Sequence, residues 1–320
     1  MGRSPWRFWA WPSELHDRGI LGINSRNGAF ILPNNRRAYY PRVDEKHITK
    51  RICHDRGIPV PDTYAFIERH GDVSKFVEMM GDRKDFVIKP AAGSAGRGIL
   101  VIQRHDGSEF FNTSGQRFTF ADMTYHIAAI LSGLYSLGGQ PDRAIIEQRI
   151  VRHPVFEQIA IDGTPDVRII LYRCVPVMAM VRLPTRASRG KANLHQGAAG
   201  AGIHLGSGRT LGGVCMDRAI VAHPDTGHTI DGLEIPFWND LLLASMDLAD
   251  ALELGYIGVD FVVDAQLGPV VLEANARPGL NIQVANRRGL LPRLRFIDSQ
   301  PENMLTRERR GELIPALAEL

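Results

Sequence analysis

The segment YIGVDFVVDAQLGPVVLEAN (residues 256–275) constrains the fold more than any other part of the chain. Two apolar runs flank a short turn, which is typical of an antiparallel β-hairpin. With the turn centred on Gln266 and Leu267, position 260 faces position 273, so Asp260 lies opposite Glu273. Directly opposed side chains have Cβ atoms roughly 4.5 to 5.5 Å apart, and two carboxylates at that distance repel unless a positive charge lies between them.

This pair of carboxylates predicts a metal site. Asn275 shares the face of Glu273, because residues two apart on a strand point the same way. Two carboxylates and an amide oxygen are hard ligands that suit Mg²⁺, so the expected ligands are Asp260, Glu273 and Asn275. In the alternative, one carboxylate faces solvent and pairs with a lysine. The apolar neighbours indicate a largely buried hairpin, where unpaired carboxylates are unfavourable, and this favours the metal.

A second hairpin is expected in DVRIILYRCVPVMAMVRLP (residues 166–184). With a turn around Val175, Arg168 faces Arg182. Two opposed guanidinium groups favour an anion between them, either a phosphate or a carboxylate. The alternative is that both arginine side chains turn outward into water.

The stretch KPAAGSAGRGIL (residues 89–100) is rich in glycine but matches neither the P-loop nor the dinucleotide-binding fingerprint. Apolar, β-prone residues precede and follow it, which predicts a strand, a glycine-rich hairpin tip and a second strand. The alternative to a phosphate-binding hairpin is a mobile turn without a ligand.

Helical periodicity alternates with these strands. Helices are expected over residues 43–56, 120–137 and 237–254, and RAIIEQRI (residues 143–150) is expected to be a short strand. Several antiparallel pairs with interspersed helices indicate a mixed α+β fold and not a regular βαβ series.

Composition excludes several classes of protein. The 320 residues carry 38 Lys and Arg against 35 Asp and Glu, a net charge of +3 without a dense basic run, so no nucleic-acid partner is expected. No segment approaches about 18 uninterrupted apolar residues, so no membrane span is expected. Three widely spaced cysteines offer neither a disulfide framework nor a CxxC metal site, and a cytoplasmic location is the default.

A family resemblance covers roughly residues 40 to 290. It rests on an ordered set of motifs: DEKHITK, GIPVPDT, FVIKPAAGSAGRGI, IIEQRI, PDVRIILY, VRLPT, KANLHQGAAGAGIHL, IGVDFVV and GPVVLEANARPGLNIQ. This set resembles the ATP-grasp superfamily, and within it the α-L-glutamate ligase-like (RimK-like) branch. The segments HQGAAGAGIHL and EIPFW also resemble ATP-grasp relatives associated with sugar transfer.

The resemblance implies an ATP-grasp fold in which two α+β lobes clamp ATP. The expected parts are a shortened N-terminal segment (1–45), an N-terminal lobe with the glycine-rich flap (46–143), a C-terminal lobe with the metal site (144–296) and a tail (297–320). The residues that the resemblance assigns to ATP are Lys46, Lys89, Ser94, Gly96, Arg97, Gly98, Glu147, Ile150 and Asp166. It assigns Asp260, Glu273 and Asn275 to Mg²⁺, with two ions expected and Mn²⁺ as an alternative, and it places Arg168, Arg182, Asn193 and His195 near the γ-phosphate and the acceptor.

The implied activity is carboxylate–amine ligation through an acyl phosphate, adding an amino acid such as glutamate to a peptide or protein acceptor. The alternatives are a ligase of cell-surface or sugar-associated biosynthesis acting on a small-molecule acceptor, and a non-catalytic ATP-binding regulatory module. Two further features of the sequence bear on the acceptor and on partners. Arg277 adds a positive charge beside the metal motif, which favours a more anionic acceptor. The N-terminal aromatics Trp6, Phe8, Trp9 and Trp11 are expected to pack as a strap on the core or to dock a protein partner or a second copy.

Overall fold

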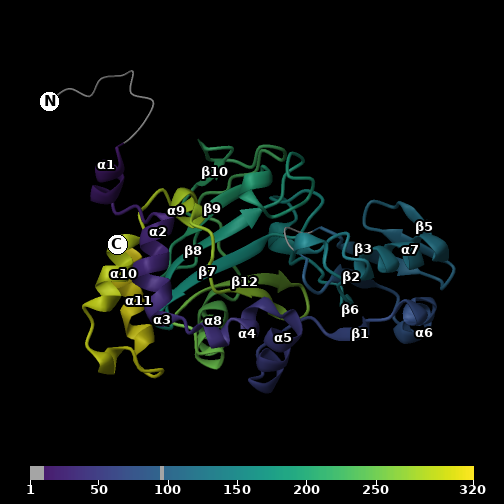
Figure 1. Ribbon diagram of the computed structural model, residues 1–320. Helices are drawn as coiled ribbons and strands as arrows, with labels where there is room; N and C mark the ends of the chain where they lie inside the picture. Colours follow the sequence, from purple (N-terminus) through teal and green to yellow (C-terminus); the bar gives the residue numbers. More distant parts are fainter. Residues whose placement is uncertain (1–10, 94–96) are drawn as a thin grey trace.

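The computed structural model describes residues 11–93 and 97–320. This part of the chain forms two antiparallel sheets with flanking helices, which confirms the α+β class (Figure 1). The predictions for Ser94, Gly96 and the aromatics at positions 6, 8 and 9 fall outside the described residues.

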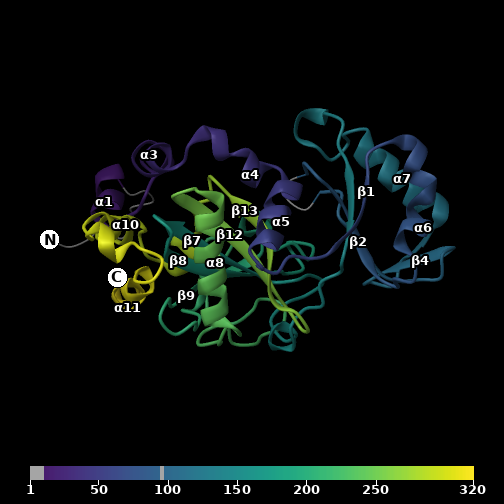
Figure 2. The same cartoon turned by 90° about the horizontal axis from the view of Figure 1, so that it is seen from below.

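The smaller sheet holds six strands and the glycine-rich hairpin. Its order is β1 (Thr63–Ile67), β6 (Ala144–Glu147), β2 (Phe86–Pro90), β3 (Leu100–His105), β4 (Glu109–Asn112) and β5 (Arg117–Thr119). Phe86 pairs with Ile102 and Ile88 with Leu100, so the expected hairpin around the glycine-rich stretch is confirmed. The helices that pack on this sheet, shown together in Figure 2, are η3 (His70–Lys75), α6 (Phe76–Met80) and α7 (Phe120–Leu131).

The larger sheet holds seven strands and both of the other hairpins. Its order is β11 (Arg218–Ile220), β10 (Gly213–Cys215), β9 (Ala199–Ile203), β8 (Val175–Leu183), β7 (Asp166–Tyr172), β12 (Tyr256–Asp264) and β13 (Gly268–Asn275). Helix α8 (Trp238–Leu252) contacts the three central strands β7, β8 and β12, and α9 (Asn281–Asn286) contacts β8, β9 and β10.

Short helices from both ends of the chain complete the larger half of the molecule. They are α1 (Pro12–Asp17), α2 (Ile23–Ser25), the π-helical turn η1 (Arg26–Ile31), α3 (Leu32–Asn34), η2 (Arg37–Tyr39), α4 (Pro41–Asp44), α5 (Lys46–Asp55), α10 (Leu291–Asp298), η7 (Glu302–Met304), η8 (Arg310–Leu313) and α11 (Ile314–Glu319). Three further 3₁₀ turns lie in loops: η4 (Leu137–Gly139), η5 (Pro154–Phe156) and η6 (Leu194–Gln196).

Each sheet has its own apolar core. The side chains of Phe76, Phe86 and Phe110 are buried in the smaller one, and Tyr256 and Phe261 in the larger. Apolar residues of the N-terminal helices, Leu21, Phe30, Ile31 and Val43, also belong to the larger core. This part of the N-terminal segment therefore packs against the sheet, whereas the Trp11 side chain is exposed.

The helix expected over residues 120–137 is shorter than the sequence pattern indicates. It ends at Leu131. Gly133 follows in a left-handed conformation (φ +84°), and a Cβ there would lie 2.3 Å from the carbonyl oxygen of Gln140. The returning chain therefore occupies the path that another helical turn would take, which a one-dimensional apolar pattern does not reveal.

Strand β9, with the sequence AGAGI, is a strand that sequence reasoning missed. Glycine and alanine are poor strand formers, but here close neighbours require them. A Cβ on Gly200 would lie 2.8 Å from a methyl carbon of Leu194, and one on Gly202 would lie 2.8 Å from Cα of Asn286. The glycines therefore let η6 and α9 lie directly on one face of the sheet.

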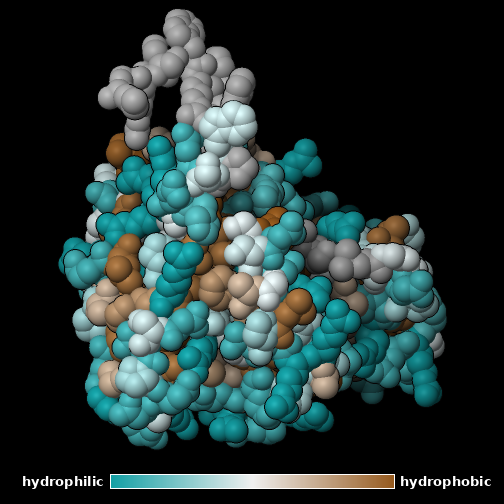
Figure 3. Space-filling view, turned by 60° about the vertical axis from the view of Figure 1, so that its left-hand side comes forward, coloured by the Kyte–Doolittle hydropathy of each residue, from teal (hydrophilic) through white to brown (hydrophobic). Residues whose placement is uncertain are grey.

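Among the described residues, no helix is both long and apolar enough to cross a membrane. On the face that carries the N-terminal helices, apolar side chains are interspersed with hydrophilic ones (Figure 3).

Replacing Gly202 with alanine is expected to destabilise the protein by about 1 to 3 kcal/mol, because the added methyl group would push α9 off the sheet. Urea unfolding measures this change. Gly71→Ala is the control, since a Cβ at that position meets nothing within 4 Å. Equal stability of the two variants would contradict the close packing of α9 on β9.

Candidate nucleotide and metal site

The carboxylates of Asp260 and Glu273 face each other as predicted. In the β12–β13 hairpin Asp260 pairs with Glu273, and Gly258 pairs with Asn275. The turn is one residue longer than expected, because Asp264 pairs with Gly268, and a bulge at Leu272 restores the expected pairing. Both carboxylates and Asn275 are therefore on one face of the sheet.

The expected pairing of Arg168 with Arg182 is wrong. Arg182 faces Asp166, and Arg168 faces Met180. The chain turns earlier than predicted, at Arg173 and Cys174, which both have positive φ values (49° and 61°), and a register shift between Ile170 and Leu171 compensates for only part of the difference. A tight turn with two left-handed residues is not indicated by these residue types, which lack the usual glycine or asparagine.

The two arginines instead surround Asp260. Arg168 donates from Nε to Oδ1 and from Nη2 to Oδ2 of Asp260, each at 2.6 Å, and Arg182 donates from Nη2 to Oδ2 at 3.0 Å. Arg182 also forms a bidentate pair with Asp166. These four charges balance, which allows them to lie together with little exposure to water.

The pKa values of the two aspartates in this cluster shift in opposite directions. Burial acts to raise the pKa of Asp260, but Arg168 and Arg182 together outweigh it and hold this pKa well below its usual range. Burial raises the pKa of Asp166 above its usual range, despite Arg182, and the negative charge of Asp260 adds to the effect. Asp260 is therefore the more firmly ionised of the two.

A second charged group lies on the smaller sheet and α5. The buried Glu147 carboxylate accepts from Lys50 Nζ at 2.5 Å and pairs on its other oxygen with Lys89. Lys50 also donates to the carbonyl oxygen of Pro61 (2.8 Å) and to Oγ1 of Thr63 (2.9 Å). Burial alone would raise the pKa of Glu147, but the two ammonium groups outweigh it, so this pKa lies below its ordinary value.

Lys46 lies between the two charged groups. Its Nζ donates to the carbonyl oxygens of Pro90 and Gly93, each at 3.3 Å. Burial lowers the pKa of Lys46, and Lys89 lowers it further, while Glu273 and Glu147 act in the opposite direction. Lys46 at the start of α5 is thus within electrostatic reach of both sheets.

The remaining predicted nucleotide residues are dispersed around this centre. Arg97 is exposed, and Gly98 (φ +74°) packs on the Tyr135 ring while its carbonyl oxygen lies 3.0 Å from Nε2 of His126. The backbone amide of Ile150 donates to no residue in the described ranges. Asp166 belongs to the arginine cluster, where both of its oxygens accept from Arg182, and its expected ribose contact stays a prediction.

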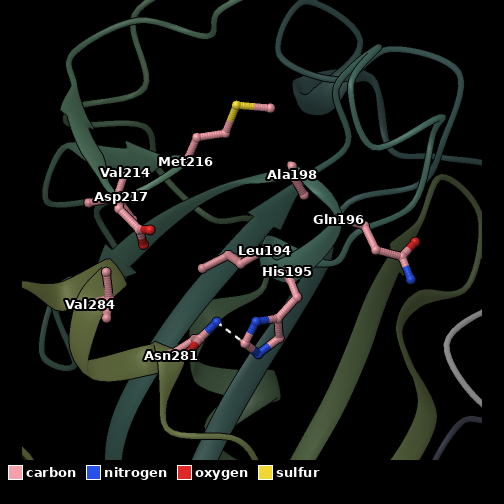
Figure 4. A pocket seen from close by; sticks show the side chains of 10 residues that line it. Leu194, His195, Gln196, Ala198, Val214, Met216, Asp217, Asn281 and Val284 are labelled. Carbon is pink, nitrogen blue, oxygen red and sulfur yellow. Dashed lines mark hydrogen bonds between the residues drawn. The ribbon is translucent and has the colours of Figure 1, made fainter.

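His195 lines a separate pocket of about 700 Å³, whereas Asn193, two residues earlier, does not belong to the lining (Figure 4). Oδ1 of Asn193 accepts from the backbone amide of His195 at 3.0 Å, and Nε2 of His195 lies 3.2 Å from Nδ2 of Asn281. The pocket lies beside the arginine cluster along the same row of strand pairs. Arg182 pairs with Gly200, and Gly200 pairs with Val214, which lines the pocket.

Sequence reasoning missed two charged residues of this site. Lys50 is one helical turn beyond Lys46, and that spacing of four was the signal that could have found it. Asp142 accepts from the backbone amide of Ala92 (3.0 Å) and from Oγ of Ser136 (2.9 Å), which fixes the start of the glycine-rich stretch. Its distance of 50 residues from Ala92 in the sequence gave no indication of this contact.

The oxygen atoms of Asp260, Glu273 and Asn275 are suitable ligands for a divalent cation, although they are not already arranged as a metal-binding group. Desolvation by the surrounding protein and the neighbouring Asp260 raise the pKa of Glu273, whose side chain still reaches solvent, so its anionic form lacks a sufficient counter-charge. A cation between the two carboxylates would supply that charge. In residues 11–93 and 97–320, however, no three His, Cys, Asp or Glu side chains already form a metal-binding group.

The fold and this charged centre have the character of a nucleotide-binding protein of the ATP-grasp type. A family model described as sugar-transfer associated ATP-grasp matches residues 25–299, and the chain belongs to this family. The α+β fold is accordingly the ATP-grasp fold.

Individual relatives are more distant. The endospore coat-associated protein YheD of Bacillus subtilis (strain 168) is 26% identical over 265 residues, which cover 81% of this chain and 52% of YheD. The chain thus spans about half the length of that curated relative. Pyruvate carboxylase from Rhizobium etli matches 87% of this chain and 20% of its own, at 16% identity and a TM-score of 0.50. The ATP-grasp ligase PsnB, complexed with a minimal precursor, covers 82% of this chain and 60% of its own, at 16% identity and a TM-score of 0.46.

Glu147→Gln is expected to lower the free energy of unfolding at pH 7 by about 3 kcal/mol, because it leaves two buried ammonium groups without their counter-charge. The folded pKa of Glu147 lies below its unfolded value, so its contribution is complete above the ordinary carboxyl pKa of about 4.3 and is lost as pH falls through the folded value. Denaturant unfolding of wild type and variant at pH 7 and at pH 3 to 4 measures the difference.

The matched control is Glu109→Gln, which removes an exposed pair with Arg117. This change is expected to cost less than about 1 kcal/mol at either pH. A loss at pH 7 that is the same for both variants would contradict the role of Glu147.

Proposed function

We propose that this chain is an ATP-dependent ligase that joins a carboxylate to an amine through an acyl phosphate. The observation that carries the proposal is the position of Lys46. It lies between the group of Lys50, Lys89 and Glu147 at the smaller sheet and the cluster of arginines and carboxylates on the larger sheet. Burial and the nearby Lys89 lower the pKa of Lys46, and the phosphates of ATP would supply an anion that stabilises its charged form. The two sheets are proposed to be the two lobes that hold the nucleotide.

Each residue has a proposed part in binding. Lys46 and Lys89 contact phosphate oxygens, and Glu147, which now holds Lys89, keeps that lysine in position. The free backbone amide of Ile150 is available to the base. Asp260, Glu273 and Asn275 would hold Mg²⁺, which when bound neutralises phosphate charge and orients the phosphoryl group. Arg168 and Arg182, fixed by Asp260 and Asp166, direct their remaining N–H groups at the transferred phosphoryl group.

The reaction has two steps. An oxygen of the substrate carboxylate attacks the γ-phosphorus, the bond to the bridging oxygen breaks and ADP leaves with that oxygen. The amine nitrogen then attacks the acyl carbon, the bond from carbon to the phosphate oxygen breaks and inorganic phosphate leaves. The nitrogen loses a proton, for which His195 in the adjoining pocket is the proposed acceptor. Such transfer requires positioning and charge neutralisation and no protein nucleophile.

The family description favours sugar-associated biosynthesis over the glutamate transfer that the RimK-like motifs suggested. PsnB is described as a ligase complexed with its precursor, so amide formation on a peptide stays a second candidate. A cytoplasmic location stays a prediction, since the curated relative is described as endospore coat-associated.

Purified protein with ATP, Mg²⁺ and mixed carboxylates and amines is expected to release ADP and phosphate in equal amounts. Release of AMP would contradict the acyl-phosphate route. The absence of any release with every acceptor would favour the regulatory ATP-binding module.

Glu273→Gln is expected to lower ADP release by at least about 100-fold and to leave the unfolding transition close to wild type, because the side chain is exposed. Glu302→Gln, which removes an exposed partner of Arg173, is the control and should retain activity. Full activity in Glu273→Gln would rule out the metal assignment.

A further inference from the structure

The pocket beside the arginine cluster has both apolar and polar walls. Leu194, Val214, Met216 and Val284 supply the large apolar side chains of its lining. Met216 is 64% exposed and Val284 is 44% exposed. Large apolar side chains that face an open pocket are typical of a site that contacts an apolar part of a ligand.

The polar groups of this pocket carry little charge. Besides His195, Gln196 and Asn281, the lining holds one carboxylate, Asp217, and among the described residues no lysine or arginine lines it. Figure 4 shows Asp217 directed toward the space between Leu194 and Val284. Asp217 is exposed and takes part in none of the ion pairs among the described residues, so its carboxylate is accessible to a ligand.

The backbone fixes Asp217 in this place. Met216 and Asp217 form the turn between β10 and β11, and both have positive φ values of 48° and 61°. Cys215 on β10 donates from Sγ to the carbonyl oxygen of Gly197 (3.5 Å), which ties the hairpin to the η6 side of the pocket. The carboxylate is thus held on a short, tightly turned hairpin and not on a long loop.

The pocket also lies close to the proposed reaction centre. Val214 lies two strands from Arg182 along one row of paired residues, roughly 10 Å across the sheet. A small molecule that fills the pocket can therefore reach the arginine cluster with one end while its body stays between the apolar walls.

We propose that this pocket binds the amine substrate, and that this substrate is a primary amine with an apolar body and no carboxylate of its own. Asp217 binds the ammonium form on arrival, and Leu194, Met216 and Val284 contact the body. This inference rests on the proposed ligase function and narrows it. An acidic amino acid such as glutamate is a poor fit, because no described cation lines the pocket to neutralise it, and Arg277 does not belong to the lining.

The test measures binding separately from turnover. Phenylethylamine, phenylethanol and glutamate are titrated calorimetrically into the protein in the presence of Mg²⁺ and a non-hydrolysable ATP analogue. Wild type is expected to bind the amine about tenfold or more tightly than the alcohol of the same shape, and glutamate most weakly. Asp217→Asn is expected to abolish the preference for amine over alcohol, whereas Met216→Ser is expected to weaken both probes by a similar factor.

Asp231→Asn is the matched control, because Asp231 is exposed and does not line the pocket, and it should behave as wild type. Tighter binding of glutamate than of the amine, or an unchanged preference in Asp217→Asn, would overturn the inference. ADP release with amines and with glutamate is measured in parallel. Release with glutamate alone would overturn this inference and leave the ligase intact, whereas amine binding through Asp217 without any ADP release would support the pocket and contradict the ligase.

Discussion

The enclosure of the Asp260 carboxylate by Arg168 and Arg182 is the interaction on which the rest of the site depends. A buried carboxylate is unfavourable without partners, and these two guanidinium groups hold it ionised while Asp166 balances the second of them. The arrangement fixes the orientation of both arginines on one face of the large sheet. It also leaves Glu273, directly opposite Asp260, exposed and with a raised pKa, and a divalent cation would stabilise its anionic form.

Charged side chains of helix α5 interact with both halves of the molecule. Lys50 binds Glu147 of the smaller sheet, whereas Lys46, one turn earlier, is within reach of Glu273 on the larger sheet. Lysine and carboxylate side chains of opposite charge therefore lie around a shared centre between the two halves. In the account proposed above, the nucleotide replaces part of this internal pairing, because its phosphates satisfy the lysines and its metal ion satisfies the carboxylates.

The sequence allowed the α+β class, the glycine-rich hairpin and the opposition of Asp260 and Glu273 to be predicted. The last of these succeeded although the turn is one residue longer than expected, because the bulge at Leu272 compensated. The same reasoning failed for Arg168 and Arg182, where an unusual turn and a register shift decide the pairing. Register irregularities depend on packing across the whole sheet, and so do the small residues of β9, whose glycines make room for Leu194 and Asn286. The ion pair of Lys50 with Glu147 and the hydrogen bond from the Ala92 amide to Asp142 are long-range contacts that no local pattern encodes.

The central claim is that residues of both sheets form one site for ATP and a divalent metal. A crystal structure with a non-hydrolysable ATP analogue and Mn²⁺ tests it most directly, because the anomalous scattering of Mn²⁺ locates the metal without reference to a model. We predict a manganese peak bound by Glu273 together with Asp260 or Asn275, and phosphate oxygens in contact with Lys46 and Lys89. A nucleotide bound elsewhere, or a metal peak that none of these three ligands contacts, would contradict the account.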